Sequence, residues 1–399
     1  MQEVRGMKDL QLISHRRMLL VLHSIFALTA VADAMTGPML PSLARTFHFS
    51  DSQSGALLFW IFAGMASGAL LARGDYVRVL TGGLLALSLC SGCFPWVPQT
   101  LLYPLAFLLG VSIGASMTAI SLFAGRNYQA KRASTLTLLN FTWSVGATVA
   151  PLVVAQLLAI FNWRAVYLVL AGAAALAAII GRLTLHDSPE AVRTTPETTG
   201  LRNLRLVSLF ALFLFLEVGI ESMFGAWIST YLLRMTLSSR TLAAAAASVF
   251  WAGFLISRGL SPLLLLRLRS GRLLQFALPL AFVAATILVA SHSPILLWTA
   301  VLLLGAALAP VFPVLLAMFF DRARHSSDSR FVLSVSGFGG SVLPWLVGSI
   351  SSHTGSLRTG FLTAPAVLLV MTAMLPLLSA RRLAQDPATS MVGRGHDPA

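Results

Sequence analysis

Long apolar runs recur from one end of this 399-residue chain to the other, separated by short clusters of arginine, proline, glycine and serine. A helix of about 20 apolar residues spans the hydrocarbon core of a bilayer and satisfies its own backbone polar groups there. Apolar side chains make up 57% of the residues and charged ones only 11%, too few for an ordinary soluble surface. The sequence therefore predicts an all-α membrane protein.

Twelve runs are long enough to cross the bilayer, so we expect twelve transmembrane helices. The predicted spans are 18–40, 53–72, 79–97, 101–124, 135–160, 165–181, 206–233, 241–266, 273–291, 295–320, 331–351 and 360–380.

The basic residues predict how these spans are oriented, because Arg- and Lys-rich loops stay on the cytoplasmic side. With the N-terminus inside, 22 of the 28 basic residues fall in cytoplasmic segments, five fall outside, and Arg258 lies within a span. The net charge of +14 is thus an orientation signal that also attracts anionic lipid, and we expect no nucleic-acid binding. We expect a multi-pass inner (plasma) membrane protein of a prokaryote-like cell, with both termini cytoplasmic.

Two six-helix halves flank the longest hydrophilic interval, residues 185–205. We expect an N-terminal bundle over 1–184, a cytoplasmic linker over 185–205, a C-terminal bundle over 206–382 and a disordered tail over 383–399.

Short matches relate the two halves. "DAMTG" at 33–37 resembles "ESMFG" at 221–225, and "GATVAP" at 146–151 resembles "GGSVLP" at 339–344, at offsets of 188 and 193 residues. Matches in the same order at nearly constant offset indicate a duplication, and a parallel six-plus-six repeat places a substrate site between the halves near the bilayer midplane.

Four ionisable residues fall well inside predicted spans: Asp33, Glu217, Glu221 and Arg258. Each costs roughly 2.5 to 3.5 kcal/mol at a helix centre, so such residues normally face a bundle interior or a water-filled cavity and mark a pathway. Glu217 and Glu221 lie four residues apart on one helix face and repel each other, which favours a shared proton. The group could load a proton on one side of the membrane and unload it on the other, or bind Na⁺ instead.

The duplication makes Asp33 and Glu221 the best candidates for proton or ion coupling. Glu217 has no acidic counterpart in the first half, and it either shares the proton or balances Arg258. Arg258 needs a counter-ion in the membrane, so we expect it to pair with a carboxylate in at least one state, as a gate or as a substrate contact.

The residues resemble the major facilitator superfamily over essentially the whole chain. The segments "VGIESMFGAWISTYL", "FWAGFLISRG" and "GAALAPVFPVLLAM" look like the seventh, eighth and tenth helices of its sugar-porter branch, around the fucose permeases and sodium-dependent glucose transporter-like proteins. The resemblance implies two pseudo-symmetric six-helix bundles. The chain departs from the superfamily in one loop: "GALLARGDYVRVL" has Ala72 where the superfamily carries an acid, and Asp75 is displaced. The charge network that usually closes the cytoplasmic gate therefore lacks this acid.

Aromatic and neutral polar residues within the spans indicate the cargo. Aromatic faces with amide edges suit a neutral polyol, and no cluster of Arg or Lys would face the cavity to bind a strongly anionic solute. The resemblance favours Trp227 and Trp251 as substrate-binding residues. The further candidates are Asn140, Trp143 and Gln275.

We therefore expect a secondary active transporter that carries a neutral sugar-like solute in symport with H⁺ by alternating access. The alternatives are a proton-coupled exporter of lipophilic cations or drugs, a Na⁺-coupled sugar transporter and a non-transporting membrane sensor. The sequence has no P-loop, HExxH or nucleophile elbow, so we expect neither an enzyme nor a metal site, and no cofactor beyond H⁺ or Na⁺ as coupling ion. The expected partners are the solute and membrane lipid, with the chain as a monomer.

Overall fold

The computed structural model describes residues 2–128, 132–186, 204–236, 239–322 and 326–378. Within these ranges every regular element is a helix and no strand occurs. Twelve segments in them are long and apolar enough to cross a membrane, which confirms the twelve predicted spans with most ends shifted by a few residues. The predicted tail 383–399 and most of the predicted linker lie outside the described residues.

The N-terminal half contains six spans made by seven helices. These are α1 (Gln2–Ala34), α2 (Thr36–Thr46), α3 (Asp51–Leu71), α4 (Tyr76–Cys93), α5 (Gln99–Asn127), α6 (Arg132–Ile160) and α7 (Trp163–Thr184).

The C-terminal half also contains six spans, two of which are interrupted. The elements are α8 (Leu204–Thr236), α9 (Arg240–Leu265), α10 (Ser270–Ala290), α11 (Pro294–Leu308), α12 (Val311–Phe320), α13 (Ser326–Thr354), α14 (Leu357–Phe361), α15 (Thr363–Met374) and the short 3₁₀ helix η2 (Leu375–Leu378).

The first span is broken at Met35, between α1 and α2. Pro38 follows three residues later, and a proline has no N–H to donate to the carbonyl of Ala34 and clashes with it. The break leaves Asp33 in the last turn of α1. Proline also accompanies the interruption between α11 and α12, at Pro310. By contrast, Pro151 and Pro344 lie within the continuous helices α6 and α13.

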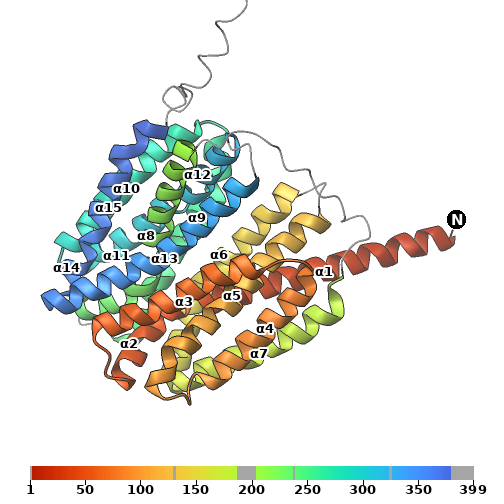
Figure 1. Ribbon diagram of the computed structural model, residues 1–399, viewed down its shortest axis with the longest axis horizontal. Helices are drawn as coiled ribbons and strands as arrows, with labels where there is room; N and C mark the ends of the chain where they lie inside the picture. The colour runs from red at the N-terminus through yellow and green to blue at the C-terminus, as the bar shows by residue number, and fades with distance from the viewer. Residues whose placement is uncertain (1, 129–131, 187–203, 237–238, 323–325, 379–399) are drawn as a thin grey trace, which may run out of the picture.

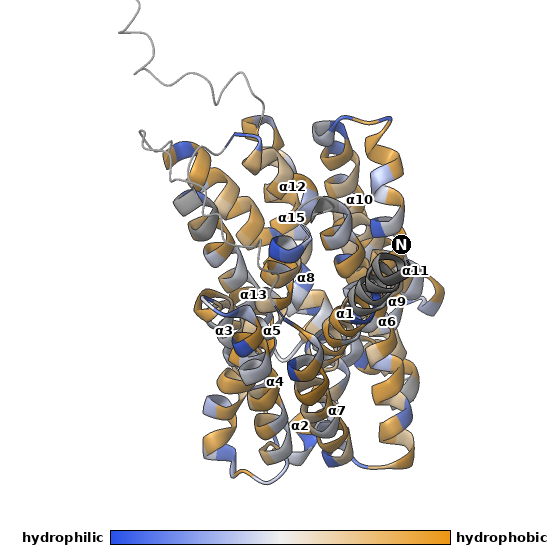
Figure 2. Cartoon of the chain, turned by 90° about the vertical axis from the view of Figure 1, so that its right-hand side faces the viewer, coloured by the Kyte–Doolittle hydropathy of each residue, from blue (hydrophilic) through white to orange (hydrophobic). Residues whose placement is uncertain are grey.

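The two halves lie side by side, with α1 to α7 in red to yellow-green and α8 to η2 in green to blue (Figure 1). The most extensive packing between them joins α3 to α13 and α6 to α9. Apolar residues predominate along the helices and hydrophilic ones gather toward their ends, as a bilayer-spanning bundle requires (Figure 2).

Polar contacts also join the halves at the end of the bundle where α2 ends and α3 begins, which we call the predicted outer end. Here Arg234 near the end of α8 forms an ion pair with Asp51 at the start of α3. The hydroxyl of Ser351 on α13 donates to the same carboxylate, and the backbone N–H of Ser52 donates to Ser352 Oγ at 2.7 Å. The halves are therefore held together at this end.

Candidate functional site

Asp33 and Glu221 line one small cavity between the two halves. Its volume is about 40 Å³, and Thr36, Ser222 and Trp251 also border it. One water molecule occupies about 30 Å³ of liquid, so the space suits one water or hydronium and is too small for a sugar ring. The structure thus brings together the two acids that the duplication singles out.

Close backbone packing between α2 and α8 holds the two halves together beside this cavity. A Cβ on Gly37 would collide with the carbonyl oxygen of Gly225. These glycines are the last residues of the matching segments 33–37 and 221–225, so each lies about one turn beyond its acid. Because small residues let helices approach closely, α2 and α8 can bring Asp33 and Glu221 to the same cavity.

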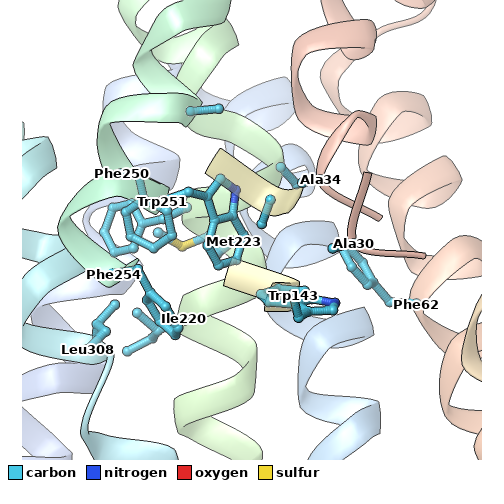
Figure 3. Close-up of a cluster of buried hydrophobic side chains, with 14 of the residues drawn as sticks. Ala30, Ala34, Phe62, Trp143, Ile220, Met223, Phe250, Trp251, Phe254 and Leu308 are labelled. Atoms are coloured by element: carbon cyan, nitrogen blue, oxygen red, sulfur yellow. The ribbon is translucent and has the colours of Figure 1, made fainter. Parts of the chain in front are cut away.

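Trp251 connects the cavity to an aromatic cluster. Its ring packs against Phe250, Phe254 and Met223 from its own half, and it meets Trp143 of the other half edge to face with centroids 5.3 Å apart (Figure 3). The indole N–H of Trp251 is buried and has no hydrogen-bond partner in the described residues, as is also true of Trp143. Trp251 thus borders the cavity that the two acids line, while its indole N–H stays buried.

Glu217 lies one turn before Glu221 on α8 and is completely buried. Neither of its carboxylate oxygens has a hydrogen-bond partner among the described residues. A buried ionised carboxylate without a partner is very costly, so this environment suits a protonated Glu217.

Arg258 on α9 bridges the halves in this conformation, and it forms no ion pair with an acid among the residues that the structure describes. Its Nη1 donates to Ser144 Oγ on α6 at 3.2 Å, and its guanidinium stacks 4.4 Å from the centre of the Phe254 ring. It is nonetheless the basic group whose charge acts on Glu217 and Glu221. The expected pairing of Arg258 with a carboxylate in another state stays a prediction.

The remaining predicted substrate residues lie at different places. Trp227 is fully buried, donates its indole N–H to the carbonyl of Pro344 at 2.9 Å and borders a second cavity at the predicted outer end. Asn140 is exposed one turn before Trp143, and its amide donates to Leu136 of its own helix. Gln275 is exposed near the start of α10, a helix that packs within its own half, so the structure does not bring it to Trp251.

Sequence reasoning missed the contacts that close the predicted outer end. Asp51 begins α3 behind a capping box of Ser50 and Gln53, and Arg234 looks like one more basic residue at a span end. Their mutual contact has no signal in a single sequence, because 183 residues separate them. In the loop that lacks the usual acid, Asp75 caps α4 and pairs with Arg78 at 3.0 Å, a purely local role.

Comparison with known proteins identifies the family. The sequence profile described as the Major Facilitator Superfamily matches residues 22–330, well over half of the chain. The chain belongs to the Major Facilitator Superfamily. Membership makes it a multi-pass membrane transporter rather than an enzyme, as the sequence predicts.

Two relatives of the chain have names that refer to sugars. The glucose/mannose transporter GlcP of Bacillus subtilis (strain 168) is 24% identical over 372 residues, which cover 87% of this chain and 92% of the relative. The sodium-dependent glucose transporter 1A of Mus musculus is 26% identical over 176 residues, 43% of this chain and 41% of the relative. These matches confirm the predicted resemblance to sugar transporters of the superfamily.

A solved structure confirms the fold. The crystal structure of a D-xylose-proton symporter has a TM-score of 0.75 with this chain at 12% sequence identity, and the match covers 90% of this chain and 96% of that one. The twelve-helix arrangement of the superfamily is therefore shared even where the sequences have diverged.

Proposed function

We propose that this protein carries a neutral sugar-like solute across the membrane in symport with protons, by rocking of its two halves. The observation that carries the proposal is the cavity of about 40 Å³ that Asp33 of one half and Glu221 of the other line together. A group shared between the halves changes its surroundings whenever they move, which is what coupling an ion to alternating access requires.

The chemistry of this cavity favours a proton over Na⁺. Two ionised acids need a hydrogen donor or a positive charge. The cavity of about 40 Å³ has room for one water or hydronium between them, and it leaves no room for the further water molecules that would complete the coordination shell of Na⁺. The size of the cavity therefore supports H⁺ as the coupling ion.

The solute itself is too large for this cavity and would bind beside it when the halves move apart. The aromatic surface of Trp251 and Trp143 provides faces on which the C–H groups of a sugar ring can pack. The named substrates of the relatives, glucose and mannose for one and glucose for the other, support a hexose as the solute. We propose that the chain acts as a monomer with both termini in the cytoplasm and needs no cofactor.

Reconstituted liposomes test the proposal. The lumenal pH is followed while D-glucose or D-mannose is added outside, with and without Na⁺. The measurement compares the wild type with Glu221→Gln. The control variant is Asp321→Asn, which alters an exposed acid at a helix end. We expect sugar-dependent acidification that is independent of Na⁺, lost in Glu221→Gln and retained in the control. Sugar uptake that requires Na⁺ without moving protons would reject the proton mechanism, and the absence of sugar flux would leave export of lipophilic cations as the function to test.

A further inference from the structure

The turn between α9 and α10 lies at the end of the bundle opposite the ion pair of Asp51 and Arg234, which we call the predicted cytoplasmic end. It joins the eighth span to the ninth. A hollow of about 470 Å³ lies against this turn and is bordered by residues 265–270. Leucine and arginine side chains supply most of its wall, so the hollow is apolar on one side and cationic on the other.

The last turn of α9 stands clear of the neighbouring helices. Leu263, Leu264, Leu265 and Leu266 are 61%, 41%, 40% and 82% exposed. Successive residues of a helix point about 100° apart, so four exposed residues in a row show that no other helix covers any side of this turn. Leucine in water is costly, and the hydrocarbon of the bilayer is the apolar medium beside the end of a span. Acyl chains therefore surround this turn.

Three arginines follow these leucines without a counter-ion. Arg267, Arg269 and Arg272 are exposed, and none of them forms an ion pair or a side-chain hydrogen bond within the described part of the chain. The sequence around them offers no acid, since no aspartate or glutamate occurs between Glu221 and Asp321. The turn thus carries three positive charges that its own stretch of chain leaves unbalanced.

The equivalent turn of the other half differs in this respect. It joins α3 to α4, the second span to the third, and so occupies the same place in the six-span repeat. There Asp75 caps α4 and pairs with Arg78 at 3.0 Å. One turn therefore balances a basic residue from within, whereas the α9–α10 turn must take an anion from outside this stretch.

The surroundings of the turn identify the kind of anion. A guanidinium binds the oxygens of a phosphate in a two-pronged manner, and two of the arginines border the hollow. The cytoplasmic leaflet carries anionic phospholipids, which hold a phosphate directly above acyl chains. Such a molecule satisfies the arginines and covers the leucines together, whereas a free phosphate ion would leave the leucines uncovered.

We propose that the α9–α10 turn is a binding site for one anionic phospholipid of the cytoplasmic leaflet. Its phosphate lies in the hollow against Arg267 and Arg269, and an acyl chain runs along Leu266. The lipid anchors the inner end of α9, the helix that carries Trp251 and Arg258 to the other half. The proposal does not depend on which solute the protein carries.

Lipid binding to the purified full chain in neutral-detergent micelles tests this site. The probes are radiolabelled dioleoylphosphatidylglycerol, which is anionic, and dioleoylphosphatidylcholine, which has no net charge. We expect the wild type to retain the anionic lipid, and Arg267→Gln/Arg269→Gln to weaken its binding by about tenfold or more, because each basic residue near anionic lipid contributes several-fold in affinity.

The equivalent turn provides a matched control. Arg73→Gln/Arg78→Gln also removes two positive charges from exposed positions at the same end, and it should bind the anionic lipid as the wild type does. Leu266→Gln tests the acyl contact and should weaken binding several-fold, although it leaves the net charge unchanged. All of these residues are exposed, so the substitutions leave the packed core of the bundle as it is.

The outcomes separate a built lipid site from general attraction. Equal weakening in the two double variants would show that net charge alone draws the lipid, and the site would be rejected. Retention of the neutral lipid to the same extent, or displacement of the anionic lipid by inorganic phosphate, would reject it as well. The site stands if only the anionic lipid is retained and only the α9–α10 variants lose it. This measurement involves neither sugar nor proton movement, so its result is independent of the proposed function.

Discussion

Arg234 of one half and Asp51 of the other form a two-pronged ion pair, with N–O distances of 2.7 and 2.6 Å. Ser351 donates a further hydrogen bond to the same carboxylate. Two parallel N–H···O bonds between guanidinium and carboxylate give geometric specificity as well as energy. In the proposed alternating access, this ion pair is a contact that breaks when the predicted outer end opens.

Neutralising Asp51 should loosen this closure. The test uses a background that carries Cys90→Ser and Cys93→Ser, with Thr230→Cys as the cysteine to be labelled. Thr230 is buried behind the ion pair. We therefore expect this cysteine to react several-fold faster with a membrane-impermeant maleimide when Asp51→Asn is added. The control is Asp75→Asn, which removes the local pair with Arg78 in another loop. Exchanging the charges in Asp51→Arg/Arg234→Asp should restore slow labelling, and equal rates in all variants would contradict this role.

The close approach of α2 to α8 at Gly37 should also be sensitive to substitution. Gly37→Ala places a methyl group against the Gly225 carbonyl, which belongs to backbone and cannot turn aside, so we expect a loss of about 1 to 3 kcal/mol in stability and of most transport. Gly82→Ala is the matched control, because nothing lies within 4 Å of a Cβ there. Thermal unfolding and sugar uptake should separate the two variants, and a fully active Gly37→Ala would show that the halves can part at this point without loss.

The sequence could predict the features that rest on local pattern. Apolar runs long enough to span the bilayer define twelve spans, and the repeat of "DAMTG" as "ESMFG" predicts that Asp33 and Glu221 lie in equivalent places. The symmetry also predicts that both acids face one cavity, because the substrate and ion sites of such repeats lie at the interface between the halves.

Features that depend on which residues meet across the halves could not be predicted. Arg258 calls for a counter-ion by its charge, yet in this conformation its partner is the neutral Ser144, 114 residues away. Trp227 and Trp251 both look like substrate residues in the sequence, but the structure places one at the outer cavity and the other beside Asp33 and Glu221. Helical periodicity gives the face of a residue and not the partner that the other half brings to it.

Asp33 should be needed more for coupling sugar transport to protons than for binding the sugar. We expect Asp33→Asn to keep sugar exchange between loaded liposomes and an external pool, which moves no net proton, while losing accumulation driven by a pH gradient. The reason is that the amide preserves the shape of the small cavity it lines but cannot take up and release a proton. The measurement compares exchange with gradient-driven uptake in the same liposomes, with Asp321→Asn as control. Equal loss of both activities would instead assign Asp33 to solute binding or folding.

Arg258 should balance the buried acids of α8 when they lose their protons. Arg258→Gln leaves Glu217 and Glu221 without the basic group that acts on them, so we expect sugar exchange to fall by about tenfold or more, since a charge in the membrane interior costs roughly 2.5 to 3.5 kcal/mol. Arg258→Lys should retain part of the activity, because it keeps the charge but not the planar group that stacks on Phe254. The decisive variant is Arg258→Gln/Glu217→Gln, which removes one charge of each sign and should recover exchange relative to Arg258→Gln alone. If the double variant is no more active than the single one, Arg258 acts through its bond to Ser144 and not as a counter-ion.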